Sequence, residues 1–281
     1  MCKKCLVLLL FVVVLSISVS QAATIVWVGQ NSDDDLLWVD FLEAQGHTVI
    51  TEGNWQEIGD AEITTMNNAD LVIFGTNGGF SSAFATSVEE ADRWNSIEKP
   101  ILCMNPSVIR GSGNYWKWFS ASTTRMNIAL STIEADEPTH PVFAGVSLDA
   151  SNKATIYTST TNGIYTVDGL DVGNGTLIAH MPNDTIMLIA YWDAGVETYD
   201  GSGVIPPAPR MVFGAAYYAQ YCVNADGEIV FINAVNFLLG GAGYGATKPK
   251  PKNGAKDIPI SNTTLSWTPG PFAYTHDVFF G

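Results

Sequence analysis

The segment Asp70–Ser82 (DLVIFGTNGGFSS) constrains the fold of this 281-residue chain more than any other segment. Its apolar run, Leu71–Phe74, contains no polar residue, which is typical of a strand buried on both faces of a parallel sheet. The run ends at Gly75, and the residues that follow are rich in Gly, Ser, Asn and Thr. In open α/β sheets, loops at the carboxyl ends of the strands line the ligand-binding edge. The segment therefore predicts a parallel sheet with a polar loop at its binding edge.

Strand-like and helix-like patterns alternate before and after this segment. The expected order is strand 24–29, a helix that begins at Ser32 and is ended by Gly46, strand 47–51, helix 60–68, strand 70–75, helix 87–97 and strand 101–104. Short links between alternating elements favour parallel strands with helices on both faces of the sheet. Later we expect a strand-rich segment at 126–166, strand-like runs at 175–180, 185–191 and 210–215, and a closing helix at 227–239. Together these elements predict one α/β domain over residues 23–241.

Residues 1–22 have the composition of a cleavable export signal. Lys3 and Lys4 give a positive start, Leu6–Leu15 is an apolar core, and small residues end at Ala22, where cleavage is expected. A permanent membrane span is the alternative, but the serine-rich, cleavable tail of the apolar run favours a signal. We therefore expect a secreted or cell-surface protein with no membrane span after cleavage.

Cleavage after Ala22 leaves two cysteines, Cys103 and Cys222. Both lie in or beside apolar strand-like runs, so two buried thiols are the favoured interpretation. One disulfide between them remains the alternative in an exported chain.

The chain is acidic, with 28 Asp and Glu residues against 13 Lys and Arg residues and a formal net charge of −15. The expected signal contains two of the lysines and no acid, so the mature chain is more negative still. A field of this sign repels nucleic acid and anionic membrane surfaces. We expect neither as a partner.

The sequence changes character after the closing helix. Residues 242–252 end in the run Lys248–Lys252 (KPKPK), which predicts a linker. Short alternating strands are expected at Thr264–Trp267 and Thr275–Phe280. Residues 253–281 thus resemble the opening strands of a fibronectin type III-like or immunoglobulin-like sandwich, a kind of domain common in secreted bacterial multidomain proteins. Such a sandwich needs about seven strands, so we expect a partial domain and a natural protein with further C-terminal domains.

Three parts of the α/β domain carry a resemblance to a known superfamily. They are 69–75 (ADLVIFG), 140–146 (HPVFAGV), and the closing pair 211–214 (MVFG) and 233–240 (NAVNFLLG). They resemble segments of the class I glutamine amidotransferase-like superfamily, in its trehalose-utilisation-like branch. The first is similar to the third strand with its oxyanion-side glycine, and the second to an HP-x-x-x-G segment. The closing pair is similar to the closing strand and helix of that branch. The resemblance implies a flavodoxin-like three-layer sandwich with a mainly parallel sheet, followed here by the truncated β-sandwich segment.

The resemblance also indicates where enzymes of this superfamily carry their nucleophile. Their strand of the type P-x-L-G-x-C-x-G ends in a strained turn that presents a cysteine, and the next backbone N–H stabilises the oxyanion. In the matching segment 99–107 (KPILCMNPS), Cys103 stands at the first glycine, Asn105 at the nucleophile and Ser107 at the second glycine. The late strand continues into 214–219 (GAAYYA), where those enzymes carry His-x-Glu. We therefore expect no amidotransferase or peptidase chemistry and no catalytic residue at these positions.

Polar side chains are expected to line a crevice where the strands end. The aromatic patch Tyr115–Phe119 (YWKWF) follows the fourth strand; packing of its rings in the core is the default interpretation, whereas an exposed Trp116 would stack on a sugar ring. The candidate ligand-binding residues are Gln30, Asn31, Thr76, Asn77, Ser81, Asn105, Asn114 and Trp116. The set is rich in amides and hydroxyls and lacks a clear titratable pair, which suits neutral polar ligands better than acid–base chemistry.

Acidic residues and histidines offer little support for a metal site. Asp33, Asp34 and Asp35 could ligate Ca²⁺, but acids in the first turn of a helix also favour its dipole without an ion. Residues 224–228 (NADGE) fit a helix cap better than a calcium loop. The four histidines are scattered without metal-ligand spacing. We expect no metal and no cofactor.

The favoured hypothesis is a secreted, non-catalytic binding or structural module of a multidomain protein that recognises neutral carbohydrate. The superfamily resemblance points toward sugars by analogy. A first alternative is a sugar-active hydrolase that uses carboxylates of the 126–205 region, with Asp149, Asp184, Asp193 and Glu197 as candidates. A second alternative is a cell-surface scaffold without a ligand.

Overall fold

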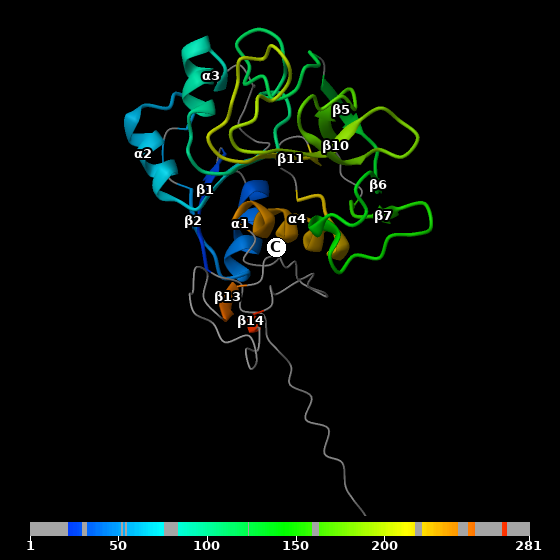
Figure 1. Ribbon diagram of the computed structural model, residues 1–281. Helices are drawn as coiled ribbons and strands as arrows, with labels where there is room; N and C mark the ends of the chain where they lie inside the picture. The colour runs from blue at the N-terminus through cyan, green and yellow to red at the C-terminus, as the bar shows by residue number, and fades with distance from the viewer. Residues whose placement is uncertain are drawn as a thin grey trace, which may run out of the picture.

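The structure is a computed structural model of the chain, shown in Figure 1. It describes residues 22–29, 33–51, 53, 55–75, 84–122, 124–158, 163–216, 221–240, 247–250 and 266–268. Apart from Ala22, the expected export signal lies outside the described residues.

A nine-stranded sheet forms the centre of the molecule, with the order β2-β1-β3-β4-β11-β10-β9-β6-β7. Phe74 of β3 pairs with Val28 of β1 and with Cys103 of β4, so the carboxyl ends of these three strands are level with one another. The strands are β1 (Thr24–Val28), β2 (Thr48–Ile50), β3 (Leu71–Phe74), β4 (Ile101–Cys103), β6 (Thr132–Ala135), β7 (Lys153–Thr155), β9 (Thr176–His180), β10 (Met187–Trp192) and β11 (Arg210–Phe213).

The expectation of a flavodoxin-like, mainly parallel sheet is wrong. The strands β2, β1, β3, β4 and β11 are parallel, but β11, β10, β9, β6 and β7 pair antiparallel throughout. The connections explain the difference. Six residues join β9 to β10, whereas a parallel pair needs a crossover of about a dozen residues or more. The described residues between β4 and β11 contain no α-helix that could form such crossovers.

A second, three-stranded antiparallel sheet has the order β12-β8-β5. Its strands are β5 (Thr124–Ile128), β8 (Ile164–Val167) and β12 (Ala215–Ala216). Only Gly214 separates β12 from β11, so one stretch of chain contributes to both sheets. The strand-rich segment expected at 126–166 is confirmed, since it contains β6, β7 and most of β5 and β8.

Helices cover both faces of the large sheet (Figure 1). α1 (Asp33–Ala44) and α4 (Ala225–Leu238) lie on one face, and α2 (Asp60–Asn68) and α3 (Val88–Asn95) lie on the other. The side chain of Asn224 accepts a hydrogen bond from Gly227 N at 3.0 Å, so the helix cap expected at 224–228 is confirmed. No helix in the described part of the chain is long and apolar enough to cross a membrane.

The last helix lies unusually close to its neighbours. A Cβ atom at Gly227 would come within 2.2 Å of Ile156 O, so only glycine permits this approach. Further along α4, the buried Asn233 side chain donates hydrogen bonds to Val142 O at 3.2 Å and Ala144 O at 2.8 Å. These bonds fix the 3₁₀ helix η2 (Pro141–Phe143) against α4.

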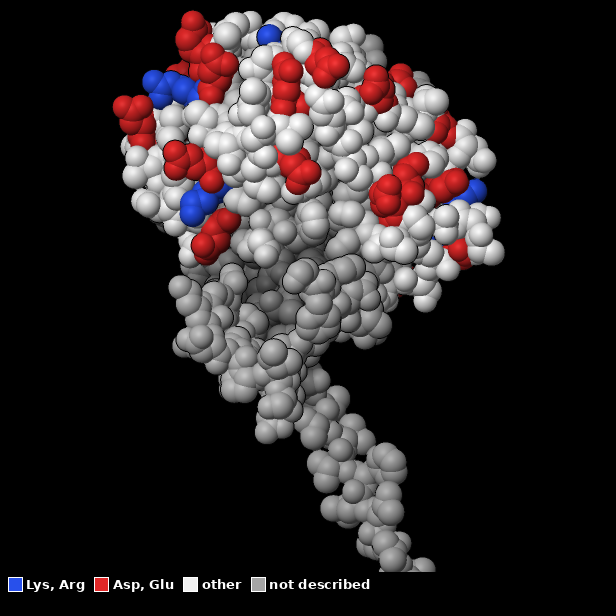
Figure 2. Space-filling view, in the orientation of Figure 1, with Lys and Arg blue, Asp and Glu red and all other residues white. Residues whose placement is uncertain are grey.

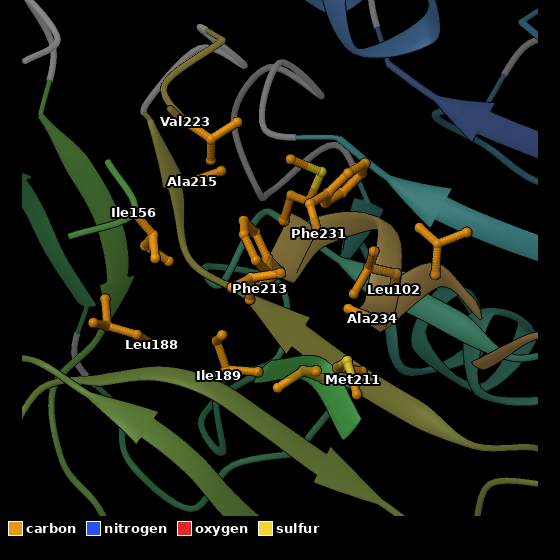
Figure 3. Close-up of a cluster of buried hydrophobic side chains, with 14 of the residues drawn as sticks. Leu102, Ile156, Leu188, Ile189, Met211, Phe213, Ala215, Val223, Phe231 and Ala234 are labelled. Carbon is orange, nitrogen blue, oxygen red and sulfur yellow. The ribbon is translucent and has the colours of Figure 1, made fainter. Parts of the chain in front are cut away.

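Two hydrophobic cores form, one on each face of the sheet. Figure 3 shows part of the core under α1 and α4, where Phe213 of β11 and Phe231 of α4 pack with ring centroids 5.5 Å apart. The second core lies under α2 and α3 and contains Trp94 and Trp116. Because both faces of the sheet are covered, β3 is apolar and buried at every position.

Two short strands are described beyond residue 241. β13 (Thr247–Lys250) and β14 (Ser266–Thr268) pair antiparallel, with Thr247 opposite Thr268. β13 falls in the segment expected to be a linker, and β14 overlaps the first strand expected for the sandwich-like segment. The second expected strand, Thr275–Phe280, lies outside the described residues. The partial domain therefore stays a prediction.

Candidate functional site

The carboxyl ends of the parallel strands form the edge at which the sequence predicts a ligand. Gly29 follows β1, Gly75 follows β3 and Gly214 follows β11, while Asn105 lies two residues beyond the end of β4. The strands that carry these residues are neighbours in the sheet. Five of the predicted crevice residues lie outside the described part of the chain, and they are Gln30, Asn31, Thr76, Asn77 and Ser81.

Trp116 lies in the core and not in a crevice. Its side chain is fully buried, and its Nε1 donates a hydrogen bond to Phe84 O at 2.9 Å. Its ring stacks on Trp94 at 4.9 Å and contacts the ring of Phe74 edge-on at 5.0 Å. No ring face is open to a sugar, so the proposed stacking role of Trp116 is wrong and the default interpretation, core packing, is confirmed.

Asn105 closes the turn after β4, at the position where the sequence resemblance would place a nucleophile. Its Oδ1 accepts hydrogen bonds from Ser107 N at 3.2 Å and from Ser107 Oγ at 2.6 Å. Both residues are buried. The side chain therefore stabilises the local backbone as an Asx turn, and the position after β4 presents no nucleophilic group.

The two cysteines are buried thiols outside any disulfide, as the favoured interpretation predicts. The Cys103 thiol lies within β4 and donates to Asn105 O at 3.1 Å. Burial raises the pKa of Cys103 far above its ordinary value. Because the thiolate is the reactive form, this residue is inert at neutral pH.

Asn114 is the third described member of the predicted set. Its side chain is exposed, and its Nδ2 donates to Thr86 O at 3.2 Å. Since Asn105 and Trp116 are buried in separate packing arrangements, the structure does not bring these three residues together as one polar surface.

Trp27 and Asp35 meet at the carboxyl end of β1, and the sequence analysis did not single them out as a pair. Both side chains are 1% exposed. A Cβ atom at Gly29 would lie 2.6 Å from Asp35 Oδ2 and 2.8 Å from Trp27 Nε1. The same construction at Gly75 would place a Cβ atom 2.9 Å from the Trp27 ring. Two glycines at the ends of adjacent strands therefore allow the indole to lie across both strand ends, beside a carboxylate.

The three consecutive aspartates do not act as a unit. Asp33 is exposed, whereas Asp35 turns inward against Gly29. The Asp34 side chain lies outside what the structure describes. Among the described residues, no group of three or more His, Cys, Asp or Glu side chains is placed to hold a metal ion.

The carboxylates of the hydrolase alternative are spread over several loops. Asp184 precedes β10 and Asp193 follows it, so about 20 Å of extended strand separates them. A glycosidase pair requires a separation of about 5–10 Å. Asp149 accepts hydrogen bonds from Ser151 N and Lys153 N, and these bonds lower its pKa.

The remaining candidates for the hydrolase serve their own loops too. Glu197 Oε1 accepts from Gly203 N at 2.8 Å, and Asp184 Oδ1 accepts from Thr185 N at 2.7 Å. Asp193 accepts from the Tyr191 hydroxyl at 2.9 Å, and burial is the largest cause of the raised pKa of that tyrosine. These contacts are those of turn residues.

The described histidines lie on separate elements. His180 Nδ1 contacts Asp136 Oδ2 at 2.8 Å and links β9 to the end of β6, a pairing that is hidden in the sequence by the 44 positions between the residues. His140 caps η2, where its Nδ1 accepts from Val142 N, and burial lowers its pKa to about 4. His47 is buried just before β2, and burial lowers its pKa as well.

Comparison with known proteins adds no assignment to this geometry. No protein-family model matches the chain, and no curated protein matches it. Any function must therefore be argued from the residues at the edge of the sheet.

Proposed function

We propose that this chain is a secreted, non-catalytic binding module of a longer protein, and that it recognises neutral carbohydrate at the carboxyl edge of its parallel strands. The observation that carries this proposal is the buried Asn105–Ser107 turn, which lies where the sequence resemblance would put a nucleophile. The carboxyl ends of the parallel strands form the edge on which open α/β sheets bind ligands. Among the described residues, the turn after β4 presents no nucleophile at that edge.

The state of Cys103 supports binding over catalysis. A nucleophilic cysteine is partly exposed and has a lowered pKa. Cys103 has the opposite properties, because it is fully buried and its pKa is raised. Among the described residues, this strand end therefore offers no reactive group for a covalent acyl-transfer step.

The charge of the chain supports a neutral ligand. The formal net charge is −15, and Figure 2 shows acidic side chains spread over the described part of one face, with few basic ones. Such a field disfavours acidic polysaccharides and phosphorylated ligands at long range. The sequence resemblance to the trehalose-utilisation-like branch supports a sugar by analogy only.

Export and membership of a longer protein belong to the same proposal. The composition of residues 1–22 supports export. The sandwich-like sequence of 253–281 supports further domains downstream. A sugar-binding module followed by sandwich-like domains is consistent with both features.

A glycan panel tests the proposal directly. The full chain is titrated by calorimetry with trehalose, maltose, cellobiose, chitobiose and a glucuronate disaccharide, with and without Ca²⁺, while release of monosaccharide is followed in the same samples. We expect saturable binding of at least one neutral sugar, no cleavage, and no binding of the acidic one. Cleavage would support the hydrolase alternative, and absence of binding to every sugar would support the scaffold; either result overturns the proposal.

A further inference from the structure

We propose that Tyr115, near the tip of the loop 105–121, is a platform on which one ring of a neutral carbohydrate stacks, while the guanidinium of Arg110 lies on the other face of the tyrosine ring. The inference rests on the proposed function and names the side chain that would contact the ligand. It arises from an accessible aromatic ring, a cation on one of its faces and a loop that holds both in place.

Tyr115 is the accessible ring of the aromatic patch 115–119. Trp116, Trp118 and Phe119 are at most 1% exposed, whereas Tyr115 is only half-buried. In the part of the chain that the structure describes, Tyr115 is not among the side chains that pack against either hydrophobic core. Its ring therefore lies at the surface and does not serve the interior.

Arg110 covers one face of this ring. Its Cζ lies 4.0 Å from the centroid of the Tyr115 ring, which is the geometry of a cation–π contact. Arg110 Nε also donates a hydrogen bond to Ser107 O at 2.8 Å, and this bond fixes the guanidinium. Among the described residues, no other ring or cation lies against Tyr115. The face opposite Arg110 is therefore the one that a ligand can approach.

The backbone of the loop holds the pair in position. Lys117 N donates a hydrogen bond to Arg110 O at 3.2 Å, so the two sides of the loop lie together. A Cβ atom at Gly111 would lie 2.6 Å from Ser120 O, so this close approach requires glycine. Because Tyr115 is ordered before a ligand arrives, less conformational entropy is lost on binding.

The tip of the loop lies beside segments that leave the carboxyl ends of the parallel strands. The loop begins after β4, and Asn114 Nδ2 donates to Thr86 O at 3.2 Å, one residue before the N-cap of α3. Among the described residues, nothing donates to Asn114 Oδ1. This oxygen can therefore accept a hydrogen bond from a ligand hydroxyl next to the Tyr115 ring.

An aromatic face beside an amide oxygen suits a neutral sugar. One face of a sugar ring presents C–H groups that pack against an aromatic ring, and its hydroxyl groups bond to polar neighbours. Tyrosine offers a large, rigid contact area at a low cost in conformational entropy. Because the guanidinium of Arg110 lies behind the ring and not across the ligand, stacking does not require a negative charge on the sugar.

The chain provides a matched control tyrosine. Tyr191 is also half-buried, but its ring lies 5.0 Å from that of Phe237 and packs against the core on the opposite face of the sheet from Trp116. Tyr191→Ala thus removes a half-buried tyrosine ring without touching the loop 105–121.

The test combines calorimetry with NMR of the tyrosine rings. The full chain, with ¹³C-labelled tyrosine rings, is titrated with the five sugars of the panel, and the Tyr115 signal is assigned from its loss in Tyr115→Phe. We expect a saturable shift of this signal with the neutral sugar that binds. Tyr115→Ala should lower the affinity at least about 10-fold, Arg110→Gln about 2- to 5-fold, and Tyr115→Phe, which keeps the ring, less than about 3-fold. Tyr191→Ala should bind as the unmodified chain does.

Thermal unfolding separates loss of recognition from loss of folding. Because Tyr115 lies outside both cores, Tyr115→Ala should be folded at the temperature of the titration. If that variant does not fold, Arg110→Gln and the Tyr115 signal of the unmodified chain decide the matter.

The outcomes distinguish this inference from the proposed function. If a neutral sugar binds but leaves the Tyr115 signal unmoved, and Tyr115→Ala binds it equally well, the inference fails while the proposed function stands. If no sugar binds, or only the glucuronate disaccharide does, both fail. A shift of Tyr115 with a neutral sugar and the expected losses in the variants supports both.

Discussion

At the scale of one residue, the side chain of Arg210 shows how a single group can connect several elements of the fold. The guanidinium of Arg210, at the start of β11, is fully buried, and burial lowers its pKa to about 9. Its terminal nitrogens donate hydrogen bonds to the carbonyl oxygens of Asn95, Ile97, Lys99, Ala208 and Pro209. The side chain thus ties β11 to the end of α3 and to the segment that leads into β4.

Arg210→Lys should destabilise the protein by about 3 kcal/mol, because an ammonium group cannot reach the same carbonyl oxygens and leaves several unsatisfied. Unfolding in urea, monitored by tryptophan fluorescence, measures the loss. The control is Arg93→Lys, which alters an exposed contact of 3.1 Å with Asp60 and should change stability by less than about 0.5 kcal/mol. Equal effects of the two substitutions would show that the buried hydrogen bonds of Arg210 are not decisive.

The sequence did not predict the surroundings of Trp116 and Trp27, and each residue shows a physical reason. Trp116 follows a strand at the binding edge, which made it a candidate for stacking on a sugar although core packing was the default interpretation, and its ring is stacked on Trp94. Trp27 lies inside an apolar run, so the pattern indicates only a core residue. Its meeting with Asp35 depends on how α1 lies against β1, which no local pattern contains. The pair of glycines at 29 and 75, each the last residue of an expected strand, was the available signal.

At the scale of elements, the parallel half of the sheet was predictable and the antiparallel half was not. The expected strands and helices up to residue 104 correspond to β1 to β4 and α1 to α3, since apolar runs and caps are local signals. In the second half, runs such as Thr176–His180 and Met187–Trp192 were recognised as strands. Their direction follows from the length of the connections and not from the runs themselves.

The contact between α4 and η2 supports a prediction at this scale. Asn233→Ala should destabilise the protein by about 2–3 kcal/mol, because it leaves Val142 O and Ala144 O without their donor in a buried place. Asn236→Ala on the same helix is the matched control: that side chain is only half-buried, and alanine favours the helix. Chemical denaturation of both variants gives the comparison. A loss below 1 kcal/mol for Asn233→Ala would contradict a clamping role.

At the scale of the whole molecule, the buried His47 and the half-buried His140 make stability depend on pH. Burial lowers the pKa of His47 and His140 from an ordinary value of 6.5, to about 4 for His140. The unfolded chain therefore binds more protons than the folded one between these values. The two histidines therefore leave the free energy of unfolding unreduced above about pH 6.5, and they lower it as the pH decreases toward 4.

We expect the free energy of unfolding to be about 2 kcal/mol lower at pH 5 than at pH 7, after allowance for the partial exposure of His140. Glu90, whose pKa is raised mainly by burial, acts in the opposite direction and lessens the effect. His47→Leu should remove part of the decrease and raise stability at pH 7, because both ring nitrogens of His47 lack partners among the described residues. Urea titrations of both proteins at the two pH values measure this, and parallel pH profiles would contradict it.

The position of β11 between the two halves of the sheet has a consequence for the order in which the chain can fold. One edge of β4 pairs with β3, but its other edge has no partner until Arg210–Phe213 has been synthesised, more than a hundred residues later. The β9–β10 hairpin closes over a short loop and can form quickly, whereas the β4–β11 pairing must close a very long one. A growing chain therefore carries an unpaired apolar edge for much of its synthesis, and such edges invite pairing with other chains. The same central strand that unites the mature molecule leaves the nascent one dependent on protection from aggregation.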